Sequence, residues 1–280
     1  MRTLTILAAS TLALILTGCP KDKAAGNDAA ITQGEARDAL EESTVESQAT
    51  ALTTSSVDIS TSFTIGKAVQ EAAGEVRKFI ETQLPCADVS LAEATLTVKY
   101  GAKGGSCVYR GHTFSGSHTI KVSKNEDAQV IVDHTWTDLS NGVVKVSGTA
   151  HVTWDIDDEY RKVQHDLTWT RLSDGRTGQG TGDRTQRPLA GGLGEGIQID
   201  GSRTWTGSKG RWDLAIEGVE ARWADPCPQA GTYRLASPKG RSLEMTFRRV
   251  DSDTISVKLS SGGRSFEFDV NSVGAVADKS

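Results

Sequence analysis

The feature that most constrains the fold is an alternation of apolar and polar residues that begins near residue 90 and continues almost to the C-terminus. Alternation with period two is typical of half-buried β-strands. Turn sequences such as Ser140-Asn141-Gly142 and Gly262-Gly263 separate the candidate strands, and no long helical pattern interrupts them. Short connections join antiparallel neighbours. The sequence therefore predicts a mainly β protein, a large antiparallel β-meander of about 11–13 strands that is curved or barrel-like. Whether the sheet closes stays open.

The turns also predict which residues face each other across the strands. If Ser140-Asn141-Gly142 is a three-residue loop with Gly142 in the left-handed conformation, Trp136 lies opposite Val146. The other turns predict further apolar pairs: Val152–Val163, Val146–Trp169, Val257–Phe268, Met245–Leu259 and Tyr233–Met245. All these turns place apolar residues on one face, as a single sheet requires.

Trp136 and Trp169 belong to an internal repeat. The segment Trp136-Thr-Asp-Leu-Ser-Asn-Gly142 recurs as Trp169-Thr-Arg-Leu-Ser-Asp-Gly175, two strands further along the chain. The two indoles therefore lie at the same end of the sheet. A row of this kind either covers a core or forms a carbohydrate-binding platform.

The strand at 176–187 has no apolar face. Gly178, Gly180 and Gly182 share one side, which indicates bending or close backbone approach. The other side is polar and, with Trp136 and Trp169, forms the candidate binding face; its residues are Thr177, Gln179, Thr181 and Asp183. In the predicted register His165 lies opposite Asp183, so we expect an ion pair there.

One clear helical pattern precedes the strands. Apolar residues recur at spacings of three and four over 65–84, and Pro85 ends the pattern. We expect this amphipathic helix to pack on its own domain. Residues 20–34 have no periodicity, and 35–55 hold a weak helical pattern followed by a Thr/Ser cluster. The expected organisation is a tether over 19–55, the helix region over 56–85, a β-domain over 86–273 and a tail over 274–280.

The N-terminus carries an export signal. An apolar run from Leu4 to Leu16 is too short to span a bilayer and leads directly into Leu16-Thr17-Gly18-Cys19. This motif resembles the lipobox of bacterial lipoproteins. The resemblance covers residues 1–19 only. It implies that residues 1–18 are a signal peptide and that Cys19 is acylated and anchors the chain to a membrane. Pro20, in place of Asp, favours the outer over the inner membrane.

Three further cysteines follow in a compartment that permits disulfides. They allow only one intramolecular bridge. We favour Cys86–Cys107, because the intervening residues hold a strand and a Gly-rich turn that bring the ends together. Cys227 is either free or the true partner of one of the other two.

Charge and motif searches exclude several classes of function. The net charge of −5 argues against nucleic acid as a partner. No zinc-type Cys/His spacing, EF-hand loop or nucleophile elbow is present in the sequence. The turn that includes Asp155 and Glu159 is acidic, and we interpret it as a solvated turn. We therefore expect no metal, no cofactor and no catalytic site.

The resulting hypothesis is a non-enzymatic, membrane-anchored envelope protein that is structural or binds an envelope protein, glycan or lipid. A first alternative is a carrier of acyl ligands in a barrel-like cavity with the 65–84 helix as its lid, which requires a lipid-sized cavity. A second is a glycan-binding or hydrolytic protein that uses the Trp row, which requires exposed Trp136 and Trp169.

Overall fold

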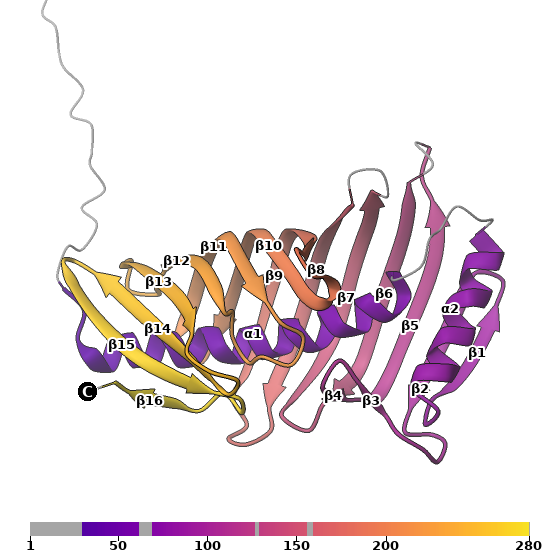
Figure 1. Cartoon of the computed structure of the whole chain (residues 1–280), viewed down its shortest axis with the longest axis horizontal. Helices are drawn as coiled ribbons and strands as arrows, with labels where there is room; N and C mark the ends of the chain where they lie inside the picture. Colours follow the sequence, from indigo (N-terminus) through magenta and orange to yellow (C-terminus); the bar gives the residue numbers. More distant parts are fainter. Residues whose placement is uncertain (1–29, 62–68, 127–128, 156–158, 280) are drawn as a thin grey trace, which may run out of the picture.

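The computed structural model describes residues 30–61, 69–126, 129–155 and 159–279 of the 280-residue chain. The predicted signal peptide with Cys19 and the centre of the acidic turn, residues 156–158, lie outside these ranges. Within them the protein is mainly β, with a long helix α1 (Gln33–Thr61) and a shorter helix α2 (Val69–Gln83) ahead of the strands (Figure 1).

Fourteen strands form one antiparallel sheet in which nearly every strand pairs with its neighbours in the sequence. The bounds are β1 (Asp88–Ala92), β2 (Thr95–Tyr100), β5 (Ser115–Lys124), β6 (Val130–Ser140), β7 (Val144–Asp155), β8 (Tyr160–Arg171), β9 (Thr177–Leu189), β10 (Gly192–Gly207), β11 (Gly210–Ala221), β12 (Ala230–Ala236), β13 (Ser242–Arg249), β14 (Thr254–Ser261), β15 (Arg264–Asn271) and β16 (Val276–Asp278). A small hairpin of β3 (Val108–Tyr109) and β4 (His112–Thr113) lies between β2 and β5 in the sequence. The predicted meander is confirmed.

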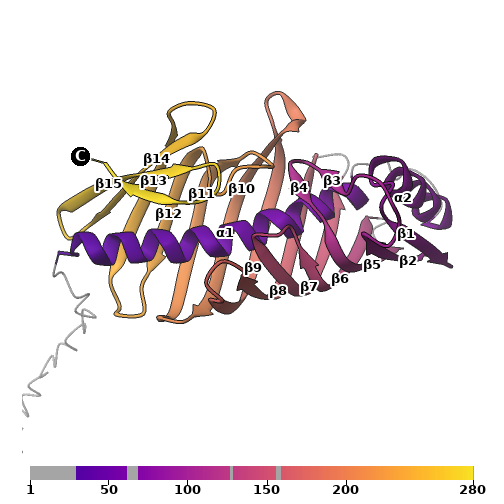
Figure 2. The same ribbon diagram turned by 90° about the horizontal axis from the view of Figure 1, so that it is seen from below.

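The sheet bends around α1 without closing. Its edge strands are β1 and β16, which do not pair with each other. Figure 2 shows β12–β15 on one side of α1 and β5–β9 on the other. The helix contacts β6, β7 and β8 as well as β14, β15 and β16. The predicted tail over 274–280 was wrong in part, because β16 adds to the sheet edge through β15.

Helix α1 begins with a capping box. The Thr32 hydroxyl accepts the Glu35 backbone N–H at 3.2 Å, and the Glu35 carboxylate accepts the Thr32 N–H at 3.1 Å. These bonds satisfy two of the donors that a helix start leaves open.

The prediction of a tether over 19–55 was wrong for residues 33–55, which are helical and largely buried. The predicted boundary between 55 and 56 falls inside α1. An amphipathic stripe marks a helix with a broad solvent face, but α1 is buried around most of its circumference and leaves only a narrow, partly exposed strip that includes Arg37, Glu41 and Gln48. Its hydroxyls turn back onto the helix, as Ser43 and Thr44 do on the Leu40 carbonyl at 3.0 and 2.8 Å.

Helix α2 agrees with the predicted amphipathic helix over its described residues. Ala72, Val76 and Ile80 are buried, and the helix packs on β1, β2 and β5 of its own sheet. Residues 65–68 of the predicted helix lie outside the described ranges. The chain leaves α2 just before Pro85, as expected.

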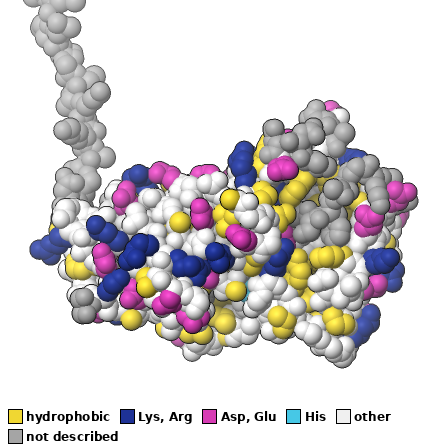
Figure 3. Space-filling model, viewed as in Figure 1, with side chains coloured by type: hydrophobic (Ala, Val, Ile, Leu, Met, Phe, Trp, Pro, Cys, Tyr) yellow, Lys and Arg dark blue, Asp and Glu magenta, His cyan; other side chains and the backbone are white. Residues whose placement is uncertain are grey.

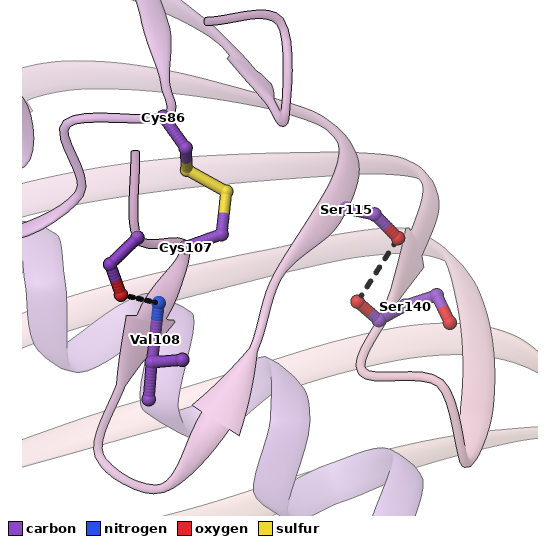
Figure 4. The surroundings of a disulfide bond; sticks show 6 residues. Cys86, Cys107, Val108, Ser115 and Ser140 are labelled. Carbon is purple, nitrogen blue, oxygen red and sulfur yellow. Dashed lines mark hydrogen bonds between the residues drawn. A yellow bond between two sulfur atoms is a disulfide. The ribbon is translucent and has the colours of Figure 1, made fainter. Parts of the chain in front are cut away.

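The disulfide Cys86–Cys107 is present, with the two Cα atoms 5.3 Å apart. Figure 4 shows that it joins the segment after α2 to the start of the β3–β4 hairpin. Next to it the Val108 N–H donates to the Ser106 hydroxyl at 3.3 Å. Cys227 is a free, buried thiol, so the alternative pairings are excluded.

Most predicted cross-strand pairs are confirmed, including Val146–Trp169 and Val257–Phe268. The β6–β7 hairpin differs by two residues, since Trp136 lies opposite Gly148 rather than Val146. Next to the turn the register differs by three residues, since Leu139 lies opposite Val146 rather than Val143, and a bulge between Trp136 and Leu139, with Asp138 at φ 51°, reduces the difference to two. A shift of two residues keeps every side chain on its face, so the predicted inner face is still correct.

The three glycines of β9 lie under large side chains. A Cβ at Gly178 would lie 2.6 Å from Trp169 Cζ2, and one at Gly182 would lie 2.4 Å from His165 Cε1. At Gly180 it would meet Trp205 Cβ at 2.7 Å. Glycine therefore permits the aromatic layer between β9 and α1, in line with the expected close approach.

We predict that Gly178→Val destabilises the protein by about 1–3 kcal/mol, because the new side chain must displace the Trp169 ring. Urea unfolding of the variant would measure the loss. Thr177→Val is the matched control, since Thr177 is exposed on the opposite face of the same strand. Equal stability of the two variants would contradict the packing argument.

Candidate functional site

Three arginines on neighbouring strands point from the sheet toward α1. Arg161 on β8, Arg184 on β9 and Arg203 on β10 are 2–3% exposed. A guanidinium stays charged at neutral pH, so its burial requires compensating partners. The partners of each arginine therefore decide what this interior can do.

Asp58 of α1 is the partner of the first arginine. Arg161 Nη1 lies 4.0 Å from its carboxylate, and the Arg110 Nε and the Tyr109 hydroxyl donate to it at 3.1 and 2.9 Å. Arg161 Nε donates to the Gln186 side chain at 2.7 Å. Burial lowers the pKa of Arg161 to about 10, which still leaves it charged at neutral pH.

Glu46 of α1 is the partner of Arg203. Arg203 Nη1 donates to the Glu46 carboxylate, and Nη2 donates to the Tyr233 hydroxyl at 2.5 Å. The Thr50 hydroxyl donates to the same carboxylate at 2.8 Å. Burial is the largest single effect and lowers the pKa of Arg203, but Glu46 and Tyr233 together outweigh it and the pKa is raised. The charge of this arginine is therefore matched by a carboxylate, although its Nε has no hydrogen-bond partner among the described residues.

Arg184 lies between the two pairs and has no carboxylate partner of its own among the described residues. Its Nη2 donates to His165 Nδ1 at 3.0 Å. Its Nε and Nη1 have no hydrogen-bond partner in the described part of the chain. Burial, and then the charge of Arg203, lower the pKa of Arg184 to about 9. The guanidinium is therefore charged at neutral pH but bonded only to an imidazole.

That imidazole is neutral. Burial, followed by the charges of Arg184 and Arg203, holds the pKa of His165 well below its ordinary value. The expected His165–Asp183 ion pair is absent: His165 lies opposite Gly182, and Asp183 contacts Gln164 and Lys162 at 3.0 and 3.3 Å. The prediction was wrong because the β8–β9 register differs by one residue, which places Gly182 opposite His165 and pairs Asp183 with the outward-facing Gln164.

A cavity of about 40 Å³ lies beside Arg184 and Arg203. The Thr54 hydroxyl from α1 lines it and also has no hydrogen-bond partner in the part of the chain that the structure describes. Isoleucines at 197, 199 and 216 form its apolar wall, and the loop with Pro226, Cys227 and Pro228 covers it. The cavity thus combines unpaired donors with an apolar surface.

Cys227 does not provide a nucleophile there. Burial raises the pKa of its thiol. A thiol that stays protonated is a weak nucleophile. The groups beside the cavity that can act are the unpaired donors of Arg184 and Thr54, and such donors suit an anion.

A second buried polar group lies near the C-terminal end of α1. His118 Nε2 and His134 Nδ1 are 2.9 Å apart, and the Tyr100 hydroxyl is 3.1 Å from His118 Nδ1. Both rings stack with Trp136. Burial lowers the pKa of His118 to about 3 and that of His134 well below its ordinary value. Both histidines are neutral at neutral pH.

The residues of the predicted binding face divide between two faces of the sheet. Trp136 and Trp169 are buried on the inner face, where the Trp136 indole donates to Ser56 of α1 at 2.9 Å. The polar set, Thr177, Gln179, Thr181 and Asp183, points to the outer face. Of the predicted binding-face residues, three line an open hollow at the end of β8–β10: Trp169, Thr177 and Gln179.

Sequence reasoning missed Glu46, Asp58 and the three arginines. One signal was available, because strand parity places Arg161 on the same face as Val163, Leu167 and Trp169. A charged residue at an inward position needs a buried partner. The partners could not be found from the sequence, since they belong to a helix without periodicity.

Searches for other types of site are negative within the described ranges. No group of three or more His, Cys, Asp or Glu side chains there could hold a metal ion. Nor is any described helix both long and apolar enough to cross a membrane. No protein-family model, curated protein or solved structure matches this chain.

We predict that removing one partner of the Glu46–Arg203 pair destabilises the protein more than replacing both partners with apolar residues. Glu46→Leu or Arg203→Met alone leaves a buried charge unpaired and costs about 3–5 kcal/mol. The double variant should lose less free energy of unfolding than the two single variants together. A double-mutant cycle of urea unfolding would measure the difference. Arg234→Met is the control: Arg234 pairs with Glu217 on the surface, and the loss there is about 0–1 kcal/mol. Additive losses in the buried pair would contradict the coupling.

We predict that stability falls as the pH drops from 6.5 to 5. The folded chain keeps His118, His134 and His165 neutral, whereas the unfolded chain protonates them below about pH 6.5. The unfolded state then binds more protons, so each histidine removes up to about 1.4 kcal/mol per pH unit. The double variant His118→Phe/His134→Phe should show a shallower slope in thermal unfolding. His151→Gln, at an exposed position, should keep the slope of the unmodified chain.

Proposed function

We propose that this chain is a lipid-anchored protein of the bacterial cell envelope that binds a ligand or partner without catalysing a reaction. The motif Leu16-Thr17-Gly18-Cys19 supports the anchor, which consists of acyl chains on Cys19. Pro20 supports the outer membrane as its destination.

The observation that carries this proposal is the Cys86–Cys107 disulfide. Disulfides form and persist in exported proteins and are rare in reducing compartments. The bridge is independent of the lipobox, because it depends on the fold of the body rather than on the N-terminal sequence. Two separate features of the chain thus favour the same compartment.

The interior favours binding over catalysis. Its histidines are neutral and enclosed, and the Cys227 thiol is held protonated by burial. Among the buried side-chain atoms of the described residues that lack a hydrogen-bond partner, two belong to the guanidinium of Arg184, which also has no carboxylate partner there. The basic and acidic side chains are interspersed on the face shown in Figure 3, so this face offers no field of a single sign to a polyanion.

The two alternative functions, an acyl-ligand carrier and a glycan-binding or hydrolytic protein, receive less support. The cavity beside Arg184, at about 40 Å³, is far smaller than the several hundred Å³ that ligand pockets for larger molecules provide. Helix α1, not α2, occupies the bend of the sheet where an acyl chain would have to lie. The Trp platform requires exposed indoles, and both Trp136 and Trp169 are buried.

We predict that the chain expressed in a bacterial host incorporates an alkyne-tagged fatty acid and fractionates with membranes. Cys19→Ser should abolish the label, because the thiol is the attachment atom. Cys227→Ser is the matched control and should keep the label, since this thiol is buried in the folded body. Labelling that survives Cys19→Ser, or an unlabelled parent chain, would contradict the anchor.

A further inference from the structure

We propose that the cavity between α1 and strands β9–β11 binds a small organic carboxylate, whose head pairs with Arg184 and whose short chain lies against the isoleucine wall. The inference deepens the proposed function and rests on it, because it names the ligand class of the binding role. The description of the cavity itself does not depend on where the protein is anchored.

The first argument is the charge balance of the interior. Arg161 faces Asp58, and Arg203 is bonded to Glu46. Arg184 lies on the strand between these two arginines. Within the described residues its only hydrogen-bond partner is a neutral histidine, His165. A buried charge without a partner is unfavourable for folding. One bound monoanion would complete the balance.

The second argument is where the unused donors lie. Arg184 Nε and Nη1, Arg203 Nε and Thr54 Oγ1 have no partner among the described residues. All three side chains line the same cavity. They come from β9, β10 and α1, and each is at most 5% exposed. Carboxylate oxygens accept from guanidinium and hydroxyl donors of this kind.

The third argument is size and polarity. A volume of about 40 Å³ exceeds what one water needs, which is roughly 10–15 Å³ on the same measure, but admits only a few non-hydrogen atoms. Ile197, Ile199 and Ile216 contribute an apolar wall. A spherical inorganic anion would leave that wall without contacts. A carboxylate with one to three further carbons satisfies both halves of the site.

The fourth argument is access. Arg222 lines the cavity and is exposed, so one side reaches the surface. The segment Pro226–Pro228 covers the rest. Asp225 also lines the cavity but is paired with Arg249, so Arg222 adds a positive charge there that attracts anions toward the interior. The ligand therefore enters between Arg222 and the proline-flanked loop.

The test uses the full chain in detergent with sodium acetate and sodium butyrate as probes. Saturation-transfer NMR on the probe methyl groups, at constant ionic strength, reports binding, and titration calorimetry gives the dissociation constant. For ligands of this size we expect about 0.1–10 mM. Sodium chloride and tetramethylammonium chloride are the comparison solutes.

Three variants test the assignment. Arg184→Met should weaken binding more than about a hundredfold, and Thr54→Val about tenfold, because each removes a donor to the carboxylate. Ala51→Leu should also abolish binding, since residue 51 lines the cavity and the larger side chain fills it. Thr53→Val is the matched control: Thr53 is the adjacent buried threonine of α1, and its hydroxyl bonds to the helix backbone.

Saturable binding that is lost in Arg184→Met and Ala51→Leu but kept in Thr53→Val supports the proposal. No saturable binding to the folded parent chain, or equal affinity for chloride, would overturn it. If Arg184→Met does not fold, Thr54→Val and Ala51→Leu decide the matter. Failure of the fatty-acid label with carboxylate binding intact would overturn the anchor alone, so the two proposals can fail separately.

Discussion

The pairing of α1 carboxylates with arginines of the sheet is the interaction on which the rest of the structure depends. Glu46 and Asp58 are separated by three turns of helix and engage Arg203 on β10 and Arg161 on β8. A helix with so few large apolar residues has no hydrophobic stripe to define how it lies in the bend of the sheet. The two ion pairs define it, because a shift along or around the axis would leave buried charges unpaired.

The same interaction explains the composition of both partners. Serine and threonine are a large share of the buried residues of α1, and several of their hydroxyls bond to the helix backbone or to groups such as the Trp136 indole. Their small size lets the sheet approach closely. On the sheet, the glycines of β9 make room for Trp169, Trp205 and His165 in the layer against the helix. The large rings and the small residues are therefore complementary parts of one packing arrangement.

The arginine row also gives the interior its chemical character. With two of the three guanidinium groups matched by carboxylates, the unmatched Arg184 is the feature that sets this core apart from a purely structural one. A neutral His165 beside it holds the side chain in place without cancelling its charge. A rigid sheet-and-helix body that carries a single unmatched charge next to a small cavity is suited to selective binding, since its donors are ordered before a ligand arrives.

The sequence by itself determined the meander, its inner face, α2 and the disulfide, because strand alternation, short turns and local spacing are encoded in neighbouring residues. Most hairpin registers followed in the same way, whereas the β6–β7 register differs by two residues at Trp136 and the β8–β9 register by one. Only the tertiary structure decided that residues 33–55 are a central helix and that Arg184 lies beside a cavity. Both depend on partners far along the chain, and a helix that buries polar residues around most of its circumference has no apolar stripe to mark it with a periodic pattern.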